Sequence, residues 1–245
     1  MKLQACLNGG WQPEAHPRLP QTPTQLAGDA VNVARVGAEA IHLHVWRPGH
    51  ETLDAHWVGE TMRHIRAAVP GMPVGISTGL WIIGSAAERL HTIQDWAQLP
   101  ARMRPDFASV NFSEEGAEEV CEALLHLDVG IEAGLESVAN VERLGRSGLS
   151  GRCLRWLVEV PPMPDLANAL SLCEQIHMEL DALGGSTERL THGEQDHTWA
   201  LLEEAGKRGD ATRIGLEDTF MLPDGTLTPD NVELVRSALQ MLAAH

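Results

Sequence analysis

Ala40-Ile41-His42-Leu43-His44-Val45 is a short apolar run in which two histidines stand two residues apart, and an amphipathic stretch follows it at residues 57–69. Side chains of a β-strand alternate between its two faces, so His42 and His44 share one face while the aliphatic residues fill the other. The amphipathic stretch has the period of an α-helix. The segment is therefore predicted to be one βα unit whose strand presents two imidazoles.

The same alternation of a short apolar run with a longer amphipathic one occurs eight times along the chain. Predicted strands cover residues 2–7, 40–45, 73–77, 107–111, 129–133, 154–158, 189–191 and 212–216. Predicted helices cover residues 22–36, 57–69, 86–98, 114–127 and 166–183, and three more begin near residues 137, 196 and 228. This pattern predicts an α/β protein, a (β/α)8 TIM barrel that forms a single domain over residues 1–245. An open doubly wound sheet is the alternative, but no glycine-rich phosphate-binding motif follows the first strand.

Two helix starts carry sequence signals for capping. Thr22 precedes Pro23, and Gln25 lies three residues after Thr22, which is the spacing of a capping box. Ser113 is the predicted N-cap of the helix at residues 114–127.

Composition excludes several classes of partner. The formal net charge of −16 argues against binding to nucleic acid or to an anionic membrane surface, because both need clustered Lys and Arg. No apolar run could span a bilayer or serve as a signal-peptide core, so we expect a soluble, cytoplasmic protein. Four widely spaced cysteines form no CxxC pair and are expected to be small buried hydrophobes, namely Cys6, Cys121, Cys153 and Cys173.

Polar residues collect where the predicted strands end. Active sites of TIM barrels lie at the carboxyl ends of the strands, so these residues are the candidate site. His16 and His192 are weaker candidates for the same pocket, because a single histidine is more often a surface or capping residue. The strand-end residues are Asn8, His42, His44, Ser77, Thr78, Asn111, Ser113, Glu132, His192, Glu194, Glu217 and Asp218.

Three of these residues have the chemistry of a metal site. In a closed barrel the second and eighth strands both neighbour the first, so their ends lie about 10 Å apart. His42, His44 and Glu217 could then share one ion, in the two-histidine, one-carboxylate pattern of catalytic zinc and of non-haem iron(II). Asp218 could point into the pocket as a base. Two plainer interpretations stay open: the histidines are hydrogen-bonded core residues, and Glu217 and Asp218 form a solvated turn.

Several motifs together resemble the β-keto acid cleavage enzymes, a family that includes the 3-keto-5-aminohexanoate cleavage enzyme of lysine fermentation. The resemblance covers nearly the whole chain. The motifs are, in order, Leu7-Asn8-Gly9-Gly10, His16-Pro17-Arg18-Leu19-Pro20-Gln21-Thr22-Pro23, Ile41-His42-Leu43-His44, Gly75-Ile76-Ser77-Thr78-Gly79, Ser109-Val110-Asn111 and Gly215-Leu216-Glu217-Asp218.

The resemblance implies a zinc-dependent TIM-barrel transferase that condenses a β-keto acid with acetyl-CoA and releases acetoacetate and a new acyl-CoA. It implies Zn²⁺ or another divalent ion as cofactor, acetyl-CoA as co-substrate and a homo-oligomer. The residues that match its metal ligands are His42, His44 and Glu217, and those assigned to catalysis are Asp218, Glu132 and Ser77. The residues assigned to substrate binding are Asn8, Thr78, Asn111, Ser113, His16, His192 and Glu194.

The chain departs from the family pattern at two places. Family members carry a Glu just after the first strand, where this chain has Gly10-Trp11, and an Arg after the seventh, where it has His192-Gly193-Glu194. Two other functions therefore stay open. One is a metal-dependent lyase or hydrolase, such as an aldolase, and the other is a non-catalytic barrel that binds a metabolite.

Overall fold

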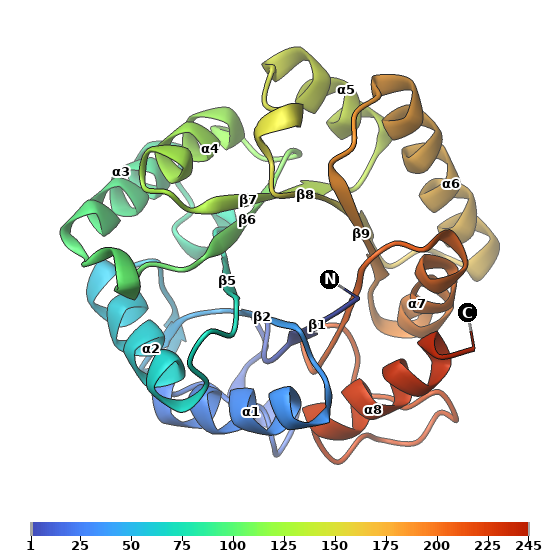
Figure 1. Ribbon diagram of the computed structural model, residues 1–245, viewed down its shortest axis with the longest axis horizontal. Coiled ribbons are helices and arrows are strands. Elements are labelled where there is room, and N and C mark those ends of the chain that lie inside the picture. Colours follow the sequence, from blue (N-terminus) through green and yellow to red (C-terminus); the bar gives the residue numbers. More distant parts are fainter. Residues whose placement is uncertain (1, 245) are drawn as a thin grey trace.

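The computed structural model describes residues 2–244 and shows parallel strands arranged as a barrel (Figure 1). The strands pair in the order β10-β1-β2-β5-β6-β7-β8-β9. A parallel bridge between Leu190 and Ala211 then links β9 to the residue before β10, so the ring nearly closes. The predicted TIM barrel is confirmed. Its strands are β1 (Leu3–Cys6), β2 (Ala40–Leu43), β5 (Val74–Ser77), β6 (Phe107–Asn111), β7 (Gly130–Leu135), β8 (Arg155–Val160), β9 (Glu188–Gly193) and β10 (Thr212–Ile214).

The helices form the outer ring of the barrel, and α8 completes the circuit beside α1 (Figure 1). Each turns an apolar stripe toward the strands, as α1 does with Leu26, Ala30 and Val33. The helices are α1 (Pro23–Val36), α2 (Ala55–Ala68), α3 (Ala86–Gln94), α4 (Ala117–His126), α5 (Val138–Ser147), α6 (Leu166–Leu183), α7 (Thr198–Arg208) and α8 (Asn231–Leu242). Short 3-10 turns lie at η1 (Pro13–Ala15), η2 (Leu80–Ile82), η3 (Asp95–Gln98), η4 (Ala101–Met103), η5 (Ser150–Arg152) and η6 (Gln195–His197).

The structure confirms one predicted cap and corrects another. The Thr22 hydroxyl accepts a hydrogen bond from the backbone N–H of Gln25, whose side chain accepts one from the backbone N–H of Thr22. Ser113, by contrast, is not a helix N-cap, because α4 begins only at Ala117. The carboxylate of Glu114 instead pairs with Arg89 and accepts from the backbone N–H of Leu80, which holds this segment out of the helix.

A small antiparallel hairpin follows β2 and was not predicted. Its strands are β3 (Trp46–Arg47) and β4 (His50–Glu51), and Trp46 pairs with Glu51. Two-residue strands are too short to show any hydrophobic period, so the sequence carries no signal for them. The hairpin brings Glu51 back to the carboxyl end of β2, beside His44.

Two glycines and one asparagine fix the backbone around Glu217. Gly9 has a left-handed φ of 62°, and a Cβ built on it would stand 2.8 Å from Cγ of Glu217. A Cβ on Gly215 would stand 1.7 Å from the carbonyl oxygen of Cys6, so only glycine lets β1 and β10 approach there. The buried Asn231 side chain accepts from the N–H of Leu216 at 2.7 Å. These contacts position the metal-ligand candidate that follows Leu216.

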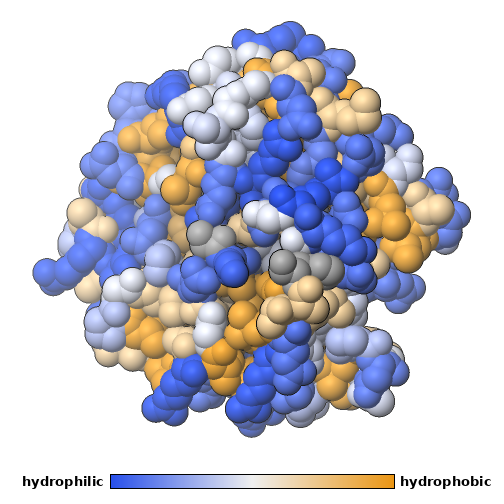
Figure 2. Space-filling model, turned by 45° about the vertical axis from the view of Figure 1, so that its right-hand side comes forward, coloured by the Kyte–Doolittle hydropathy of each residue, from blue (hydrophilic) through white to orange (hydrophobic). Residues whose placement is uncertain are grey.

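Three of the four cysteines are buried, as the sequence predicted. Cys6, Cys121 and Cys173 are buried free thiols, and Cys153 is partly buried and also free. On the face in Figure 2, hydrophilic residues predominate and apolar patches lie between them. Within residues 2–244, no helix combines the length and apolar character that a membrane span requires.

Candidate active site

A cavity of about 300 Å³ opens at the carboxyl ends of the strands, where active sites of this fold lie. The three metal-ligand candidates are in its wall, together with Ser77, Asn111 and Glu194 from the predicted set. The full lining is Gly10, Trp11, His42, His44, Ser77, Trp81, Ser109, Asn111, Glu159, Glu194, Arg213 and Glu217.

His42, His44 and Glu217 converge on one point of this cavity. Oε1 of Glu217 lies 3.8 Å from Nε2 of His42 and 3.4 Å from Nε2 of His44. One ligand atom from each residue lies within 4.8 Å of the other two, as ligands around one ion must. The two histidines are buried and Glu217 is 13% exposed. The structure thus brings together the three residues that the sequence analysis predicted to share one ion.

Each histidine has a second carboxylate behind it, at the other ring nitrogen. Nδ1 of His44 lies 2.5 Å from Oε1 of Glu51, and Nδ1 of His42 lies 3.8 Å from Oε2 of Glu132. Both rings therefore turn Nε2 toward Glu217 and Nδ1 toward a carboxylate, which is at hydrogen-bond distance from His44 but not from His42. Histidines that bind metals usually show this arrangement, because the carboxylate fixes the ring orientation and raises the basicity of the ligating nitrogen.

The carboxylates around His44 favour a positive charge at this point of the site. Burial disfavours the charged form of His44, yet the carboxylates of Glu217 and Glu51 raise its pKa to about 10. Burial opposes ionisation of Glu217 too, but Arg213 and the two histidines hold the pKa of its carboxyl well below the usual range. Burial lowers the pKa of His42 to about 3, so this ring is neutral and able to act as a ligand. A proton on His44 occupies the place that a metal ion would take.

The residues present fit a divalent ion. Two imidazoles, which bind metals in their neutral form, and one carboxylate are a ligand set typical of catalytic zinc. Three such ligands leave the fourth coordination position of zinc open. Oε2 of Glu217 is buried and has no hydrogen-bond partner among residues 2–244, an expensive arrangement for a carboxylate oxygen. A metal ion at this point would satisfy that oxygen.

Arg213, on β10, is a functional candidate that the sequence reasoning missed. Its guanidinium lies in the cavity wall and donates to Oε1 of Glu217 at 3.1 Å and to Oδ1 of Asp218 at 3.1 Å. It also lies 3.3 Å from Nδ1 of His192. An arginine inside a buried three-residue strand, four residues before a glutamate, was the available signal. Arg213 supplies a guanidinium to the pocket even though none follows the seventh strand.

Asp218 is not among the residues that line the cavity; its fully buried side chain lies against the lining residue Arg213. It is buried, and its Oδ2 has no hydrogen-bond partner within the described residues. Burial raises the pKa of Asp218 to about 8; Arg213 opposes this rise and Glu217 adds to it. A carboxylate with a raised pKa and an unpartnered oxygen is suited to accept a proton near neutral pH.

The other predicted residues take varied places. Asn8 uses its whole side chain on the backbone of His44, with 2.9 Å bonds to its N–H and C=O. Thr78 donates to the carbonyl of Ser109 at 2.6 Å. Glu132 is fully buried behind His42, where it accepts hydrogen bonds from Gln4 and Arg155 at 2.9 Å. Asn8 and Thr78 therefore fix the backbone of the cavity wall, and Glu132 is held by Gln4 and Arg155 behind it.

His16 and His192 lie outside the set that lines the cavity. His16 contacts the carbonyl of Thr228 at 3.0 Å and stacks on Phe220. His192 is buried between Arg213 and Glu159, and burial followed by Arg213 lowers its pKa well below the usual value. Both ring nitrogens of His16 are hydrogen-bonded within the fold, whereas Nδ1 of His192 accepts from Arg213 and its buried Nε2 has no hydrogen-bond partner among residues 2–244.

Two more lining residues, Glu159 and Trp81, escaped the sequence analysis, and so did Glu51, which contacts the lining residue His44. Glu159 lies on β8, and burial raises its pKa to about 8, with Arg213 opposing and Glu194 contributing. Trp81, in η2, is 56% exposed at the cavity mouth. Glu51 is in the unpredicted hairpin. Trp81 and Glu51 stand away from the predicted strand ends, whereas Glu159 directly follows the strand predicted at residues 154–158 and was overlooked.

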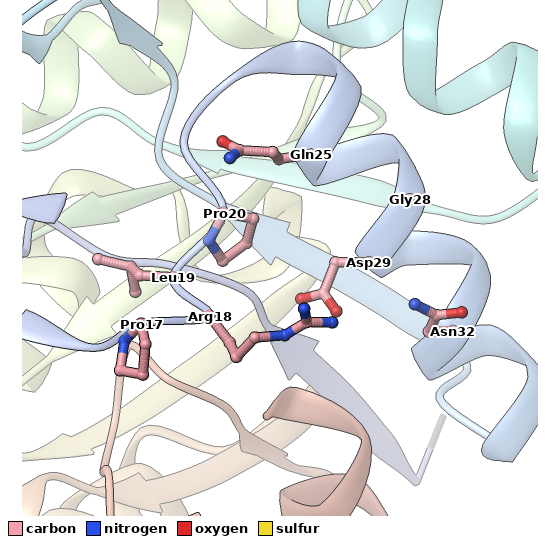
Figure 3. A pocket seen from close by; sticks show the side chains of 8 residues that line it. All are labelled: Pro17, Arg18, Leu19, Pro20, Gln25, Gly28, Asp29 and Asn32. Carbon is pink, nitrogen blue, oxygen red and sulfur yellow. The ribbon is translucent and has the colours of Figure 1, made fainter. Parts of the chain in front are cut away.

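A second cavity of about 260 Å³ lies outside the barrel, where the loop after β1 meets α1 (Figure 3). The side chain of Arg18 extends toward Asp29 there (Figure 3). Asp29 accepts a hydrogen bond from Asn231 at 2.6 Å, and burial raises its pKa to about 6. The residues that line this cavity include no histidine or cysteine, and it is separate from the strand ends.

Comparisons with known proteins agree with the fold and place the chain in a family. The sequence profile of the beta-keto acid cleavage enzymes matches residues 1–149 and 156–245. A 3,5-dioxohexanoate:acetyl-CoA acetone transferase of Paraburkholderia graminis is 24% identical over 268 residues, which cover 94% of this chain and 85% of that protein.

Solved structures of ObcA, as the apo protein and as a binary complex with oxaloacetate, are 15% and 14% identical, with TM-scores of 0.73 and 0.75. Both cover 93% of this chain, which spans 62% and 64% of those chains, and they support the fold alone. With the family profile matched along almost its whole length, the chain belongs to the beta-keto acid cleavage enzyme family.

Proposed function

We propose that this chain is a metal-dependent enzyme that condenses a β-keto acid with acetyl-CoA and releases acetoacetate and a new acyl-CoA. The observation that carries the proposal is the convergence of His42, His44 and Glu217 in one strand-end cavity, beside Arg213, which contacts the buried Asp218. Acetyl-CoA as co-substrate is supported by the Paraburkholderia relative, whose name includes it.

His42, His44 and Glu217 would hold the ion, and zinc suits this donor set. A divalent ion bound there withdraws charge from the ketone and carboxylate oxygens of a keto acid and makes the carbon between them easier to deprotonate. Arg213 adds a guanidinium to the same wall, which can pair with a substrate carboxylate.

Asp218 is the proposed base. Its unpartnered Oδ2 accepts the proton from the carbon between the two carbonyl groups, and its raised pKa favours this transfer. Arg213 contacts Asp218 at 3.1 Å and orients it. The cavity wall also offers the Ser77 hydroxyl and the Asn111 amide as donors to oxyanions that develop during the reaction.

In the proposed reaction the carbon between the two carbonyl groups gains the acetyl group of acetyl-CoA and loses its original acyl group to CoA. The deprotonated carbon attacks the thioester carbonyl of acetyl-CoA, a carbon–carbon bond forms, and the CoA thiolate leaves. The thiolate then attacks the ketone carbon of the original keto acid, and the bond between that carbon and the acetylated carbon breaks. The broken bond's electron pair stays on the acetylated carbon, which takes back the proton from Asp218. The products are acetoacetate and the acyl-CoA of the original keto acid.

The test is acetoacetate formation from acetyl-CoA and a panel of β-keto acids with neutral, acidic and basic side chains. We expect at least one keto acid to give acetoacetate and acyl-CoA in equal amounts, and Asp218→Asn to lose most of this activity while it remains folded. If no keto acid in the panel yields acetoacetate while the protein holds one metal ion per chain, the proposal is wrong and an aldolase or hydrolase is favoured.

A further inference from the structure

Glu51 connects two walls of the active-site cavity. Its Oε1 lies 2.5 Å from Nδ1 of the metal-ligand candidate His44. Its Oε2 accepts a hydrogen bond from the indole N–H of Trp81 at 3.1 Å. The rings of His44 and Trp81 also stack, with centroids 6.2 Å apart and planes inclined by 27°. One carboxylate therefore joins the metal-ligand candidate to the exposed aromatic ring at the mouth of the cavity.

The local backbone is built around this carboxylate. Trp46 pairs with Glu51 across the hairpin, and its indole N–H donates to the carbonyl of Gly9 at 3.2 Å, which anchors the hairpin to the loop after β1. A Cβ on Gly10 would stand 3.1 Å from Oε2 of Glu51, and one on Gly79 would stand 2.1 Å from the Trp81 ring. Both positions thus leave room for the contact between Glu51 and Trp81.

The donor and acceptor roles in this contact are determined by chemistry. An ionised carboxylate only accepts hydrogen bonds, so Nδ1 of His44 must carry the proton that it shares with Glu51. With the proton on Nδ1, Nε2 is the nitrogen available to bind a metal ion, and this nitrogen faces Glu217 at 3.4 Å. The indole of Trp81 can only donate, so it needs the second oxygen of the same carboxylate.

We infer that Glu51 is a positioning residue that couples metal binding to the aromatic wall of the substrate cavity. By holding His44 it orients a metal ligand, and by holding Trp81 it keeps the indole over the mouth. Because linkage is reciprocal, metal bound at His44 stabilises the placed Trp81, and placed Trp81 raises metal affinity. The metal ligand set of this inference is that of the proposed function, but its test does not need the reaction.

Substitution of Glu51 separates the two contacts. An amide keeps one acceptor oxygen and turns the other into an NH2 donor, so in Glu51→Gln the oxygen can take the place of Oε1 beside His44 or of Oε2 beside Trp81, but not both. Trp81→Phe keeps a ring at the mouth and removes the competing N–H. We therefore expect Glu51→Ala to weaken Zn²⁺ binding on the order of 10–100-fold, Glu51→Gln to weaken it less, and Glu51→Gln with Trp81→Phe to bind zinc more tightly than Glu51→Gln alone.

Zinc affinity is measured by competition with a chromophoric chelator, and Trp81 is followed as the difference in fluorescence between the wild type and Trp81→Phe. We expect zinc to change the Trp81 contribution in the wild type and not in Glu51→Ala. Glu194→Gln is the matched control, because it removes one charge from the same cavity wall and contacts neither histidine. Its zinc affinity should stay within about twofold of the wild type.

The outcomes separate this inference from the proposed function. Glu51 variants that bind zinc as tightly as Glu194→Gln would overturn the coupling, whatever the activity of the wild type. A wild type that binds no zinc would overturn it as well. A wild type that binds zinc with the expected dependence on Glu51, yet yields no acetoacetate, supports the coupling and refutes the proposed reaction.

Discussion

Substitution of Gly9 by alanine should weaken the metal site through one methyl group. Gly9 has φ of 62°, a region that costs a residue with a side chain about 1–2 kcal/mol. Its new Cβ would stand 2.8 Å from Cγ of Glu217, whereas carbon atoms in contact normally stand about 3.5–4.0 Å apart. Glu217 must therefore retreat on the order of 1 Å, and we expect zinc affinity to fall roughly 10–100-fold, as when a supporting contact is lost.

The control for this prediction is Gly209→Ala. Gly209 has φ of 76° at the end of α7, and a Cβ there would meet no atom within 4 Å. Gly209→Ala should lose about 1–2 kcal/mol of unfolding free energy in denaturant titrations and Gly9→Ala at least as much, but only Gly9→Ala should lose zinc affinity in chelator competition. Equal zinc affinity of the two variants would refute the reasoning that Gly9 exists to admit Glu217.

Two further predictions concern the polar contacts behind the site. The folded-state pKa of Asp29, about 6, exceeds its ordinary value of 3.8, so its ionisation costs stability as the pH rises through this window. Asp29→Asn should therefore be more stable than the wild type at pH 7, by up to about 3 kcal/mol, and the gain should vanish near pH 4 in denaturant titrations at both pH values. Asn231→Ala leaves the buried N–H of Leu216 and C=O of Leu7 unpaired and should lose about 2–5 kcal/mol by the same measurement; a loss below about 1 kcal/mol would contradict its assigned role.

The fold was predictable because its signal is repeated. Each βα unit carries the same change of hydrophobic period, so an error at one boundary leaves the other seven units intact. The predicted start of α4 was wrong because of a tertiary contact. Ser113 and Glu114 have the composition of a helix start, but Arg89 from α3 forms an ion pair with the Glu114 carboxylate. A contact between side chains distant in sequence overrides a capping pattern.

The candidate site was partly predictable for a geometric reason. Alternation placed His42 and His44 on one strand face, and the order of strands in a barrel brought Glu217 to them. Glu51 and Arg213 could not be found in this way. Glu51 lies in a hairpin whose strands are too short to show a hydrophobic period, and Arg213 lies inside a strand, between Thr212 and Ile214, whereas the rule selected residues at strand ends.

The family pattern and the structure place the arginine of the pocket on different strands. In the family pattern an arginine follows the seventh strand, where this chain has His192, Gly193 and Glu194. The structure places the guanidinium of Arg213 in the cavity from β10 and seats His192 against it at 3.3 Å. An arginine can reach one cavity from different strands of a barrel, because all the strand ends surround the same space.

The metal content of the purified protein tests the central claim most directly. Elemental analysis of the wild type, His42→Ala and Glu217→Ala, with circular dichroism to confirm that each is folded, gives the number of ions per chain. We predict about one zinc or other divalent ion per chain in the wild type, as for a site with a single set of ligands, and loss of most of it in both variants. Equal metal content in all three folded proteins would contradict the account.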